Sequence, residues 1–167
     1  MKVIGLIRQS WPTLLGLFLM VAVPMVLLRN HHQKNQSYQA DDLIWHKWYP
    51  GIIEVNRPNG RIIWLNYTAD WSATIKVNEM TLLSDQQVIA ALHRHGVMMV
   101  KVDCTFPKPE IQAELKRYKG SVLPKNFLIP SDPDAPYLQL PELVTPEVFL
   151  AALKEARYLS FADPSGP

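Results

Sequence analysis

The chain has 167 residues, 48% of them hydrophobic, which is enough for one folded domain with a buried core and an accessory segment. Its formal net charge of +2 is too small to indicate a nucleic-acid-binding protein. Because Cys104 is the single cysteine, an intramolecular disulfide is excluded, and cysteine usage does not identify the cellular compartment.

The first long apolar segment is residues 11–28, which carry no charge and follow a short flank at residues 1–10. As a helix these residues would be about 27 Å long, close to the roughly 30 Å of a bilayer's hydrocarbon core. We therefore predict a transmembrane anchor at residues 11–29. A cleaved signal peptide is the alternative, although no Ala-x-Ala site ends the run. Basic residues are nearly balanced on its two sides, so charge does not define the orientation.

Residues 30–42 are polar and have no apolar periodicity, so they are predicted to be a tether. Extended, thirteen residues reach at most about 45 Å, which would keep the folded domain near the membrane. The pair His31 and His32 could bind a metal, but no further ligand follows at a typical spacing. We interpret the pair as part of a solvated linker, and we predict neither a metal nor a cofactor.

The folded domain is predicted to begin at residue 43 with an aromatic-rich strand at 43–49. Residues 52–55 indicate a second short strand or edge segment between two Pro/Gly/Asn turns. Residues 61–67 are almost continuously apolar, which is typical of a central strand buried on both faces.

Two helices and a buried strand are predicted next. The first helix covers residues 73–83, and the second starts with Ser84 as N-cap, with Gln87 closing a capping box. Gly96 ends the second helix, and a strand follows at 97–102. The apolar side chains expected on the inner face of the second helix are Val88, Ala91 and Leu92.

The C-terminal part of the domain reads as a helix, a hairpin and a last helix. The helix covers residues 108–119, with Ile111 and Leu115 inward and Gly120 at its end, and strands at 125–129 and 137–140 form an antiparallel hairpin. Thr145 is expected to cap the last helix, which begins at Pro146. Its expected inner face is Val148, Phe149, Ala152 and Leu153. The elements indicate an α/β domain with a mixed sheet at residues 43–159, followed by a disordered tail at 160–167.

One stretch connects the central strand to its following helix and reads Thr-Ala-Asp-Trp-Ser-Ala-Thr-Ile-Lys-Val-Asn-Glu over residues 68–79. Three further motifs lie at residues 102–105 (Val-Asp-Cys-Thr), 122–124 (Val-Leu-Pro) and 140–146 (Leu-Pro-Glu-Leu-Val-Thr-Pro). In order and spacing they resemble the C-terminal thioredoxin-like domain of the DsbD/ScsB membrane thiol-disulfide reductases, whose motif is Thr-Ala-Asp-Trp-Cys-x-x-Cys-Lys-x-Asn-Glu. The resemblance covers roughly residues 45–157 and implies a thioredoxin-like fold, in agreement with the elements.

The same resemblance places Ser72 and Ile75 where the family has its two cysteines. Thiol-disulfide exchange needs an attacking thiolate and a resolving thiol, whereas a serine hydroxyl stays protonated at neutral pH and isoleucine has no reactive atom. We therefore predict a pseudo-oxidoreductase without catalytic residues, in which Ser72 caps the helix. A nucleophilic Ser72 is disfavoured, because the nearest candidate bases, His93 and His95, are predicted at the end of another helix without an acid partner. Cys104 is interpreted as a small buried hydrophobe; a lone redox thiol is the alternative.

The resemblance also implies a peptide-binding lip beside a cis-proline, where a partner segment adds as a strand. The candidate partner-binding residues are Trp71, Ser72, Ala73, Thr74, Leu123, Pro124 and Lys125. Lys125 departs from the family pattern, and either makes the groove more cationic or faces solvent. A turn at Pro124 without any partner is the alternative interpretation.

Together these inferences predict a membrane-anchored, redox-inactive thioredoxin-like protein that binds a protein partner or assists assembly at a membrane or periplasmic redox complex. A permanent accessory subunit of a membrane complex and an enzyme using Cys104 are the alternatives. The resemblance implies a single-pass protein of the bacterial inner membrane with a periplasmic domain. The identity of the partner does not follow from the sequence.

Overall fold

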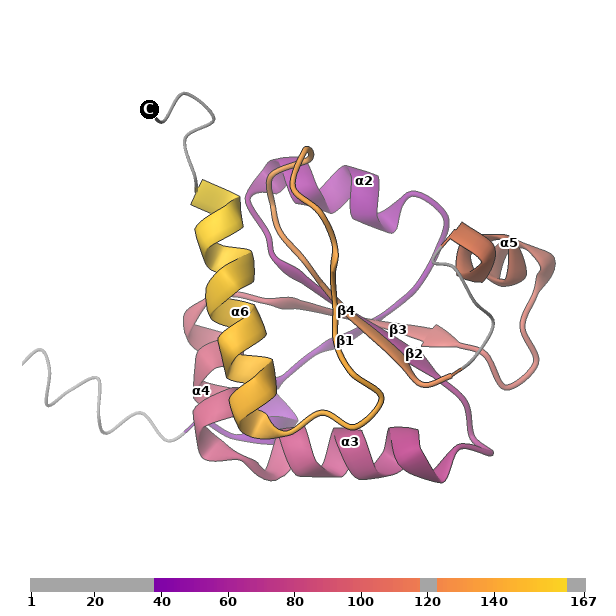
Figure 1. Cartoon of the computed structure of the whole chain (residues 1–167), viewed down its shortest axis with the longest axis horizontal. Helices are drawn as coiled ribbons and strands as arrows, with labels where there is room; N and C mark the ends of the chain where they lie inside the picture. The colour runs from indigo at the N-terminus through magenta and orange to yellow at the C-terminus, as the bar shows by residue number, and fades with distance from the viewer. Residues whose placement is uncertain (1–37, 118–122, 162–167) are drawn as a thin grey trace, which may run out of the picture. The chain divides into compact units, whose positions relative to one another are not determined.

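The structure, a computed structural model, describes residues 38–117 and 123–161 (Figure 1). The predicted flank, the anchor at 11–29, the histidine pair, Gly120, and residues 162–167 of the predicted tail lie outside the described residues. Among the described helices none is both long and apolar enough to cross a membrane.

The domain is built on a five-stranded mixed sheet with the strand order β1-β3-β2-β4-β5. The strands are β1 (Trp45–Lys47), β2 (Ile63–Thr68), β3 (Met98–Asp103), β4 (Lys125–Ile129) and β5 (Leu138–Gln139). β3 lies parallel to both β1 and β2, whereas β4 is antiparallel to β2 and to β5. The predicted central strand and C-terminal hairpin are therefore confirmed.

Helices cover both faces of the sheet. They are α2 (Ile52–Asn56), α3 (Ala73–Ser84), α4 (Gln86–Arg94), α5 (Pro109–Arg117) and α6 (Pro146–Phe161), with short 3-10 turns at Ala40–Asp42 and Arg57–Asn59. Side chains alternate along β2, so that Ile63 and Leu65 pack toward α2 and α5, whereas Trp64 packs toward α4 and α6 (Figure 1). This alternation explains why the β2 sequence is apolar at nearly every position.

The predicted strand at residues 52–55 is wrong, because these residues form helix α2. Ile52 and Ile53 are both buried in the same core. Neighbouring side chains in a strand point to opposite faces, whereas in a helix they can turn toward one sheet. Tertiary packing has overridden the β preference of these β-branched residues.

The predicted capping box at the start of α4 is also wrong. Asp85 is the N-cap, and its Oδ1 accepts hydrogen bonds from the backbone N–H groups of Gln87 (2.8 Å) and Val88 (3.0 Å). Ser84 ends α3 instead, and its hydroxyl donates to the carbonyl of Thr81. The carboxylate is the better cap because it accepts both bonds and carries the negative charge that a helix N-terminus favours.

The last helix, α6, starts as predicted: Pro146 is its first residue, and the Thr145 hydroxyl accepts a hydrogen bond from the Val148 N–H. Phe149 and Leu153 are buried as expected. Val148 was expected on the inner face but is exposed, and Ala156 occupies the next inward position. Helix α6 also includes residues 160 and 161 of the predicted tail.

Candidate functional site

The site lies where β2 ends and α3 begins. Ser72 is buried, and its Oγ accepts a hydrogen bond from the Ile75 N–H at 3.4 Å, so the predicted helix cap is confirmed. Ile75 is 1% exposed and belongs to the core beside Tyr67 and Ala69. The two positions that hold cysteines in the DsbD motif therefore have a capping role and a packing role here.

The ends of β2 and β3 are held together next to Ser72. The Cys104 N–H donates to the Thr68 carbonyl at 2.7 Å, and the Asp70 N–H donates to Thr105 Oγ1 at 3.0 Å. Thr105 in turn hydrogen-bonds Asp103 through its backbone N–H and its hydroxyl, and both bonds lower the pKa of the Asp103 carboxyl. These bonds fix the loop before α3 against the loop after β3.

Asn78, in the middle of α3, links this helix to the loop that precedes α6. It is 3% exposed, and its amide donates to the Glu142 carbonyl at 2.6 Å and accepts from the Val144 N–H at 3.2 Å. One side chain thereby satisfies a donor and an acceptor of a loop that lies 64 residues away in the chain. The Asn of the DsbD-like motif is structural here.

Glu79, the last residue of the motif, sits in a charged network with the sheet. Its carboxylate accepts from the Asn66 amide at 2.8 Å and forms an ion pair with Lys101 at 2.9 Å. The Lys101 ammonium also lies 4.7 Å from the centre of the Trp45 ring. Since these partners come from β1, β2 and β3, the network attaches α3 to three strands.

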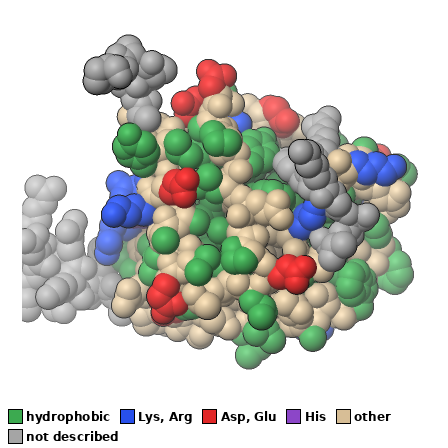
Figure 2. Space-filling model, in the orientation of Figure 1, with side chains coloured by type: hydrophobic (Ala, Val, Ile, Leu, Met, Phe, Trp, Pro, Cys, Tyr) green, Lys and Arg blue, Asp and Glu red, His purple; other side chains and the backbone are tan. Residues whose placement is uncertain are grey.

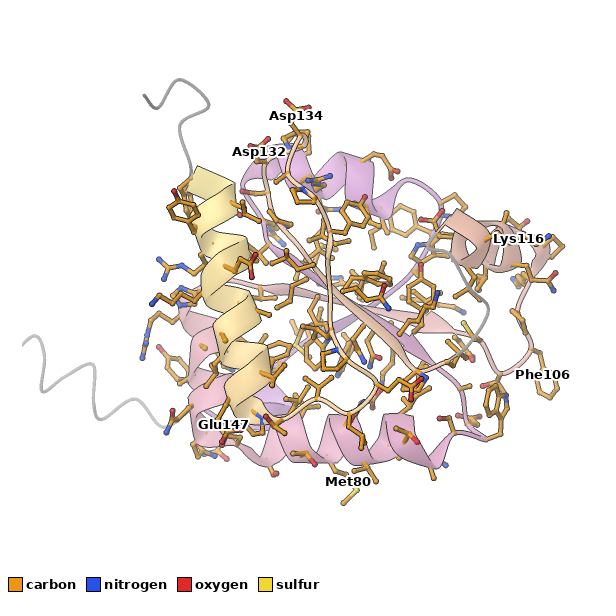
Figure 3. All side chains as sticks on the ribbon, in the orientation of Figure 1. Met80, Phe106, Lys116, Asp132, Asp134 and Glu147 are labelled. Atoms are coloured by element: carbon orange, nitrogen blue, oxygen red, sulfur yellow. The ribbon has the colours of Figure 1, made fainter. Side chains whose placement is uncertain are left out.

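A groove of about 550 Å³ opens beside this junction. Its lining residues are Trp71, Cys104, Thr105, Pro107, Gln112, Leu115, Lys116 and Leu123. Trp71 on one side is 65% exposed, and Phe106 beside the groove is 90% exposed and points outward in Figure 3. The Leu123–Pro124 peptide bond is cis, as the resemblance implies.

The structure brings together only some of the candidate binding residues. Trp71 and Leu123 line the groove, but Ala73 is exposed on α3 and Thr74 is half-buried there, outside the lining. Lys125 was expected to line the groove or face solvent; it does neither, because it is 6% exposed within β4.

Sequence reasoning missed the side of the groove formed by α5 and the loop before it, chiefly Pro107, Gln112 and Lys116. These residues follow β3 and have no counterpart in the motifs. Because only the packing of α5 against the sheet brings them into one groove with Trp71, no local sequence pattern predicts their position.

Cys104 lies at the base of the groove and is 3% exposed. Its thiol contacts the Val102 carbonyl at 3.7 Å. Burial and, secondarily, the negative charge of Asp103 raise the pKa of the Cys104 thiol to about 11. This environment suits the predicted small buried hydrophobe and disfavours a reactive thiolate.

We expect Cys104 to react slowly with iodoacetamide in the folded protein. Raising the thiol pKa from 9.0 to about 11 lowers the thiolate fraction near neutral pH about a hundredfold, and burial slows the reaction further. Alkylation followed by mass spectrometry should therefore be slow at pH 8, rise toward pH 11, and become fast in urea. Rapid labelling of the folded chain at pH 7 would support a redox thiol instead.

Neither His93 nor His95, the two candidate bases, hydrogen-bonds Ser72. His93 stacks on Tyr38 at 4.7 Å, and His95 lies near Arg157 and Arg94, whereas the Ser72 hydroxyl contacts the backbone of Ile75. Among residues 38–117 and 123–161, no three His, Cys, Asp or Glu side chains are grouped as metal ligands.

The strand order and the helices on both faces of the sheet define a thioredoxin-like fold, in a chain that carries a single cysteine and so no Cys-x-x-Cys pair. A thioredoxin from Thermus thermophilus superposes with a TM-score of 0.57 at 19% identity, over 72% of this chain and 91% of that one. The reduced C-terminal domain of Neisseria meningitidis DsbD superposes with a TM-score of 0.54 at 22% identity, over 67% of this chain and 100% of that one.

The sequence is also similar to the thiol:disulfide interchange protein DsbD of Pseudomonas fluorescens Pf-5, with 32% identity over 69 residues. That match covers 41% of this chain and 12% of DsbD. No protein-family model matches the chain. The chain thus has a thioredoxin-like fold and is similar in part of its sequence to DsbD, and Ser72 and Ile75 stand where the DsbD motif has its two cysteines.

Proposed function

We propose that this chain is a membrane-anchored, redox-inactive thioredoxin-like protein that binds a protein partner through the groove beside Trp71. The observation that carries the proposal is this groove of about 550 Å³, which adjoins the start of α3, where no thiol is present. A surface suited to binding remains where the dithiol of an oxidoreductase would be.

The groove has the composition of a protein-binding site. Exposed tryptophans commonly act as binding hot spots, and Trp71 and Leu123 supply apolar surface. Gln112 and Lys116 add hydrogen-bond donors and a positive charge on the opposite side. The occupant that fits best is an extended segment with an apolar side chain for Trp71 and an acidic residue for Lys116.

The relatives support a partner in a redox complex. One relative is named as a thiol:disulfide interchange protein, DsbD, and one similar structure is the C-terminal domain of a DsbD. A domain of this kind that lacks a Cys-x-x-Cys pair, and whose one thiol at Cys104 is buried, can bind such a partner but cannot carry out dithiol-disulfide exchange with it. We place the domain at a membrane or periplasmic redox complex, as a partner-binding or assembly module of the bacterial inner membrane.

Site-specific photocrosslinking in intact membranes tests the groove. A photoreactive phenylalanine analogue at Phe106 or Gln112 is expected to trap a protein partner, whereas the same analogue at Tyr158, which is 73% exposed on α6, is not. Trp71→Ala should lower the crosslink yield, because removing a tryptophan hot spot weakens binding about thirtyfold.

Two results would contradict the proposal: no adduct from either groove position, or equal adducts with and without the Trp71 side chain. The lifetime of the complex is a separate measurement. A partner that co-purifies stoichiometrically in mild detergent would indicate a permanent subunit, and one found only with immature complexes would indicate an assembly factor.

A further inference from the structure

A second hollow, a cleft of about 460 Å³, lies between helices α4 and α6. Its polar lining side chains are Gln86, Gln87, Arg94, His95, Lys154 and Arg157. Its apolar lining includes Ala91 from α4 and Leu153 from α6. None of these residues belongs to the groove beside Trp71.

The cleft is strongly cationic. No Asp or Glu lines it, and no ion pair joins Arg94, Lys154 or Arg157 to a carboxylate of the described residues. Lys and Arg side chains gather on the side of the molecule where α4 and α6 lie (Figure 2). Burial and the charges of Arg157 and Arg94 lower the pKa of His95, which indicates that these positive charges act on one shared space.

The first described residues, Tyr38 and Gln39, contact the C-terminal end of α4. The Tyr38 ring stacks on His93, the residue before Arg94, and the His93 ring nitrogen lies 3.4 Å from the Gln39 carbonyl oxygen. The predicted anchor ends at residue 29, and the eight residues 30–37 can span at most about 28 Å. The cationic cleft therefore adjoins Tyr38 and Gln39, which belong to the predicted tether of residues 30–42.

We infer that the cleft between α4 and α6 binds the headgroup phosphate of an anionic phospholipid in the membrane that holds the anchor. Guanidinium groups bind phosphate oxygens in a bidentate manner, and basic residues next to a membrane anchor are attracted to anionic headgroups. The inference rests on the proposed anchor but not on the groove. It would orient the domain, with the α4–α6 side toward the bilayer.

The test uses the full chain in lipid nanodiscs that contain a nitroxide-labelled headgroup, with amide signals followed by NMR. In nanodiscs with phosphatidylglycerol, signals of α4 and α6 around Arg94 and Arg157 are expected to broaden; in phosphatidylcholine alone they should not. The double variant R94Q/R157Q should lose the broadening, because each basic residue contributes about fivefold to headgroup affinity and two contribute about 25-fold. The control K47Q/K76Q removes the same charge at exposed positions outside the cleft.

Headgroup binding by the cleft and membrane insertion of the anchor are measured by separate readouts. Co-elution of the chain with nanodiscs of either lipid reports the anchor alone. Equal broadening in both lipids, or broadening that survives R94Q/R157Q in a folded variant, would overturn the inference. The inference would also be overturned if inorganic phosphate shifted the amide signals of the cleft and the titration of His95 while labelled headgroups caused no broadening. The cleft would then be a site for a free anion and not for a lipid headgroup.

Discussion

Replacing Ser72 and Ile75 together by cysteine is expected to create a dithiol that can be oxidised to a disulfide and reduce insulin. The two positions lie one turn apart at the start of α3, and position 72 is the N-cap, where unpaired N–H groups and the helix dipole stabilise a thiolate. The wild-type chain should show no turnover in the same assay, because its single thiol is buried.

The single variants provide the controls. Ser72→Cys supplies an exchangeable thiol without a resolving partner and should form mixed disulfides only, whereas Ile75→Cys should place a thiol in the core. Ile75→Cys also removes buried methyl groups, so a loss of about 2 kcal/mol in the free energy of unfolding is expected. Dithiol-dependent turnover by the wild-type chain would overturn the redox-inactive proposal. If the folded double variant keeps both new thiols titratable after oxidation, no disulfide has formed between positions 72 and 75. The geometry at the start of α3 would then not support disulfide formation.

The sequence predicted the fold well where local patterns are strong. The apolar run in β2, the positive-φ Gly96 that ends α4 and the Thr145-Pro146 start of α6 are each determined by a few neighbouring residues. Helix α2 was missed because its β-branched residues favour a strand locally, and only packing of Ile52 and Ile53 on one face of the sheet makes them helical.

The site was harder to predict than the fold. Motif matching identified Trp71, Ser72 and the cis Leu123–Pro124 bond, because these lie within contiguous stretches. It could not identify Lys116 as the groove's cation or Lys125 as a buried residue. Whether a lysine in a strand points to water or into the domain depends on the helices that cover that strand, and this information lies elsewhere in the chain.

Replacing Asn78 by alanine is expected to lower the free energy of unfolding by about 3 kcal/mol, because the Val144 N–H and the Glu142 carbonyl would both lose their partner in a largely buried setting. Urea unfolding of the full chain, followed by tryptophan fluorescence, measures this loss. Val77→Ala, at the neighbouring and 52% exposed position of α3, is the matched control and should change stability by less than about 0.5 kcal/mol.

Asn78→Asp sharpens the same test. The substituted side chain can still accept from the Val144 N–H, but its second oxygen faces the Glu142 carbonyl, so the variant should be destabilised at neutral pH and recover in part when acid protonates that oxygen. A stable Asn78→Ala variant would mean that this amide does not hold the loop before α6. If Asn78→Ala instead unfolds easily while Trp71→Ala keeps full stability and loses its crosslinks, the DsbD-like motif of this chain divides into two parts. Asn78 then maintains the fold, Trp71 binds the partner, and neither role requires the missing thiols.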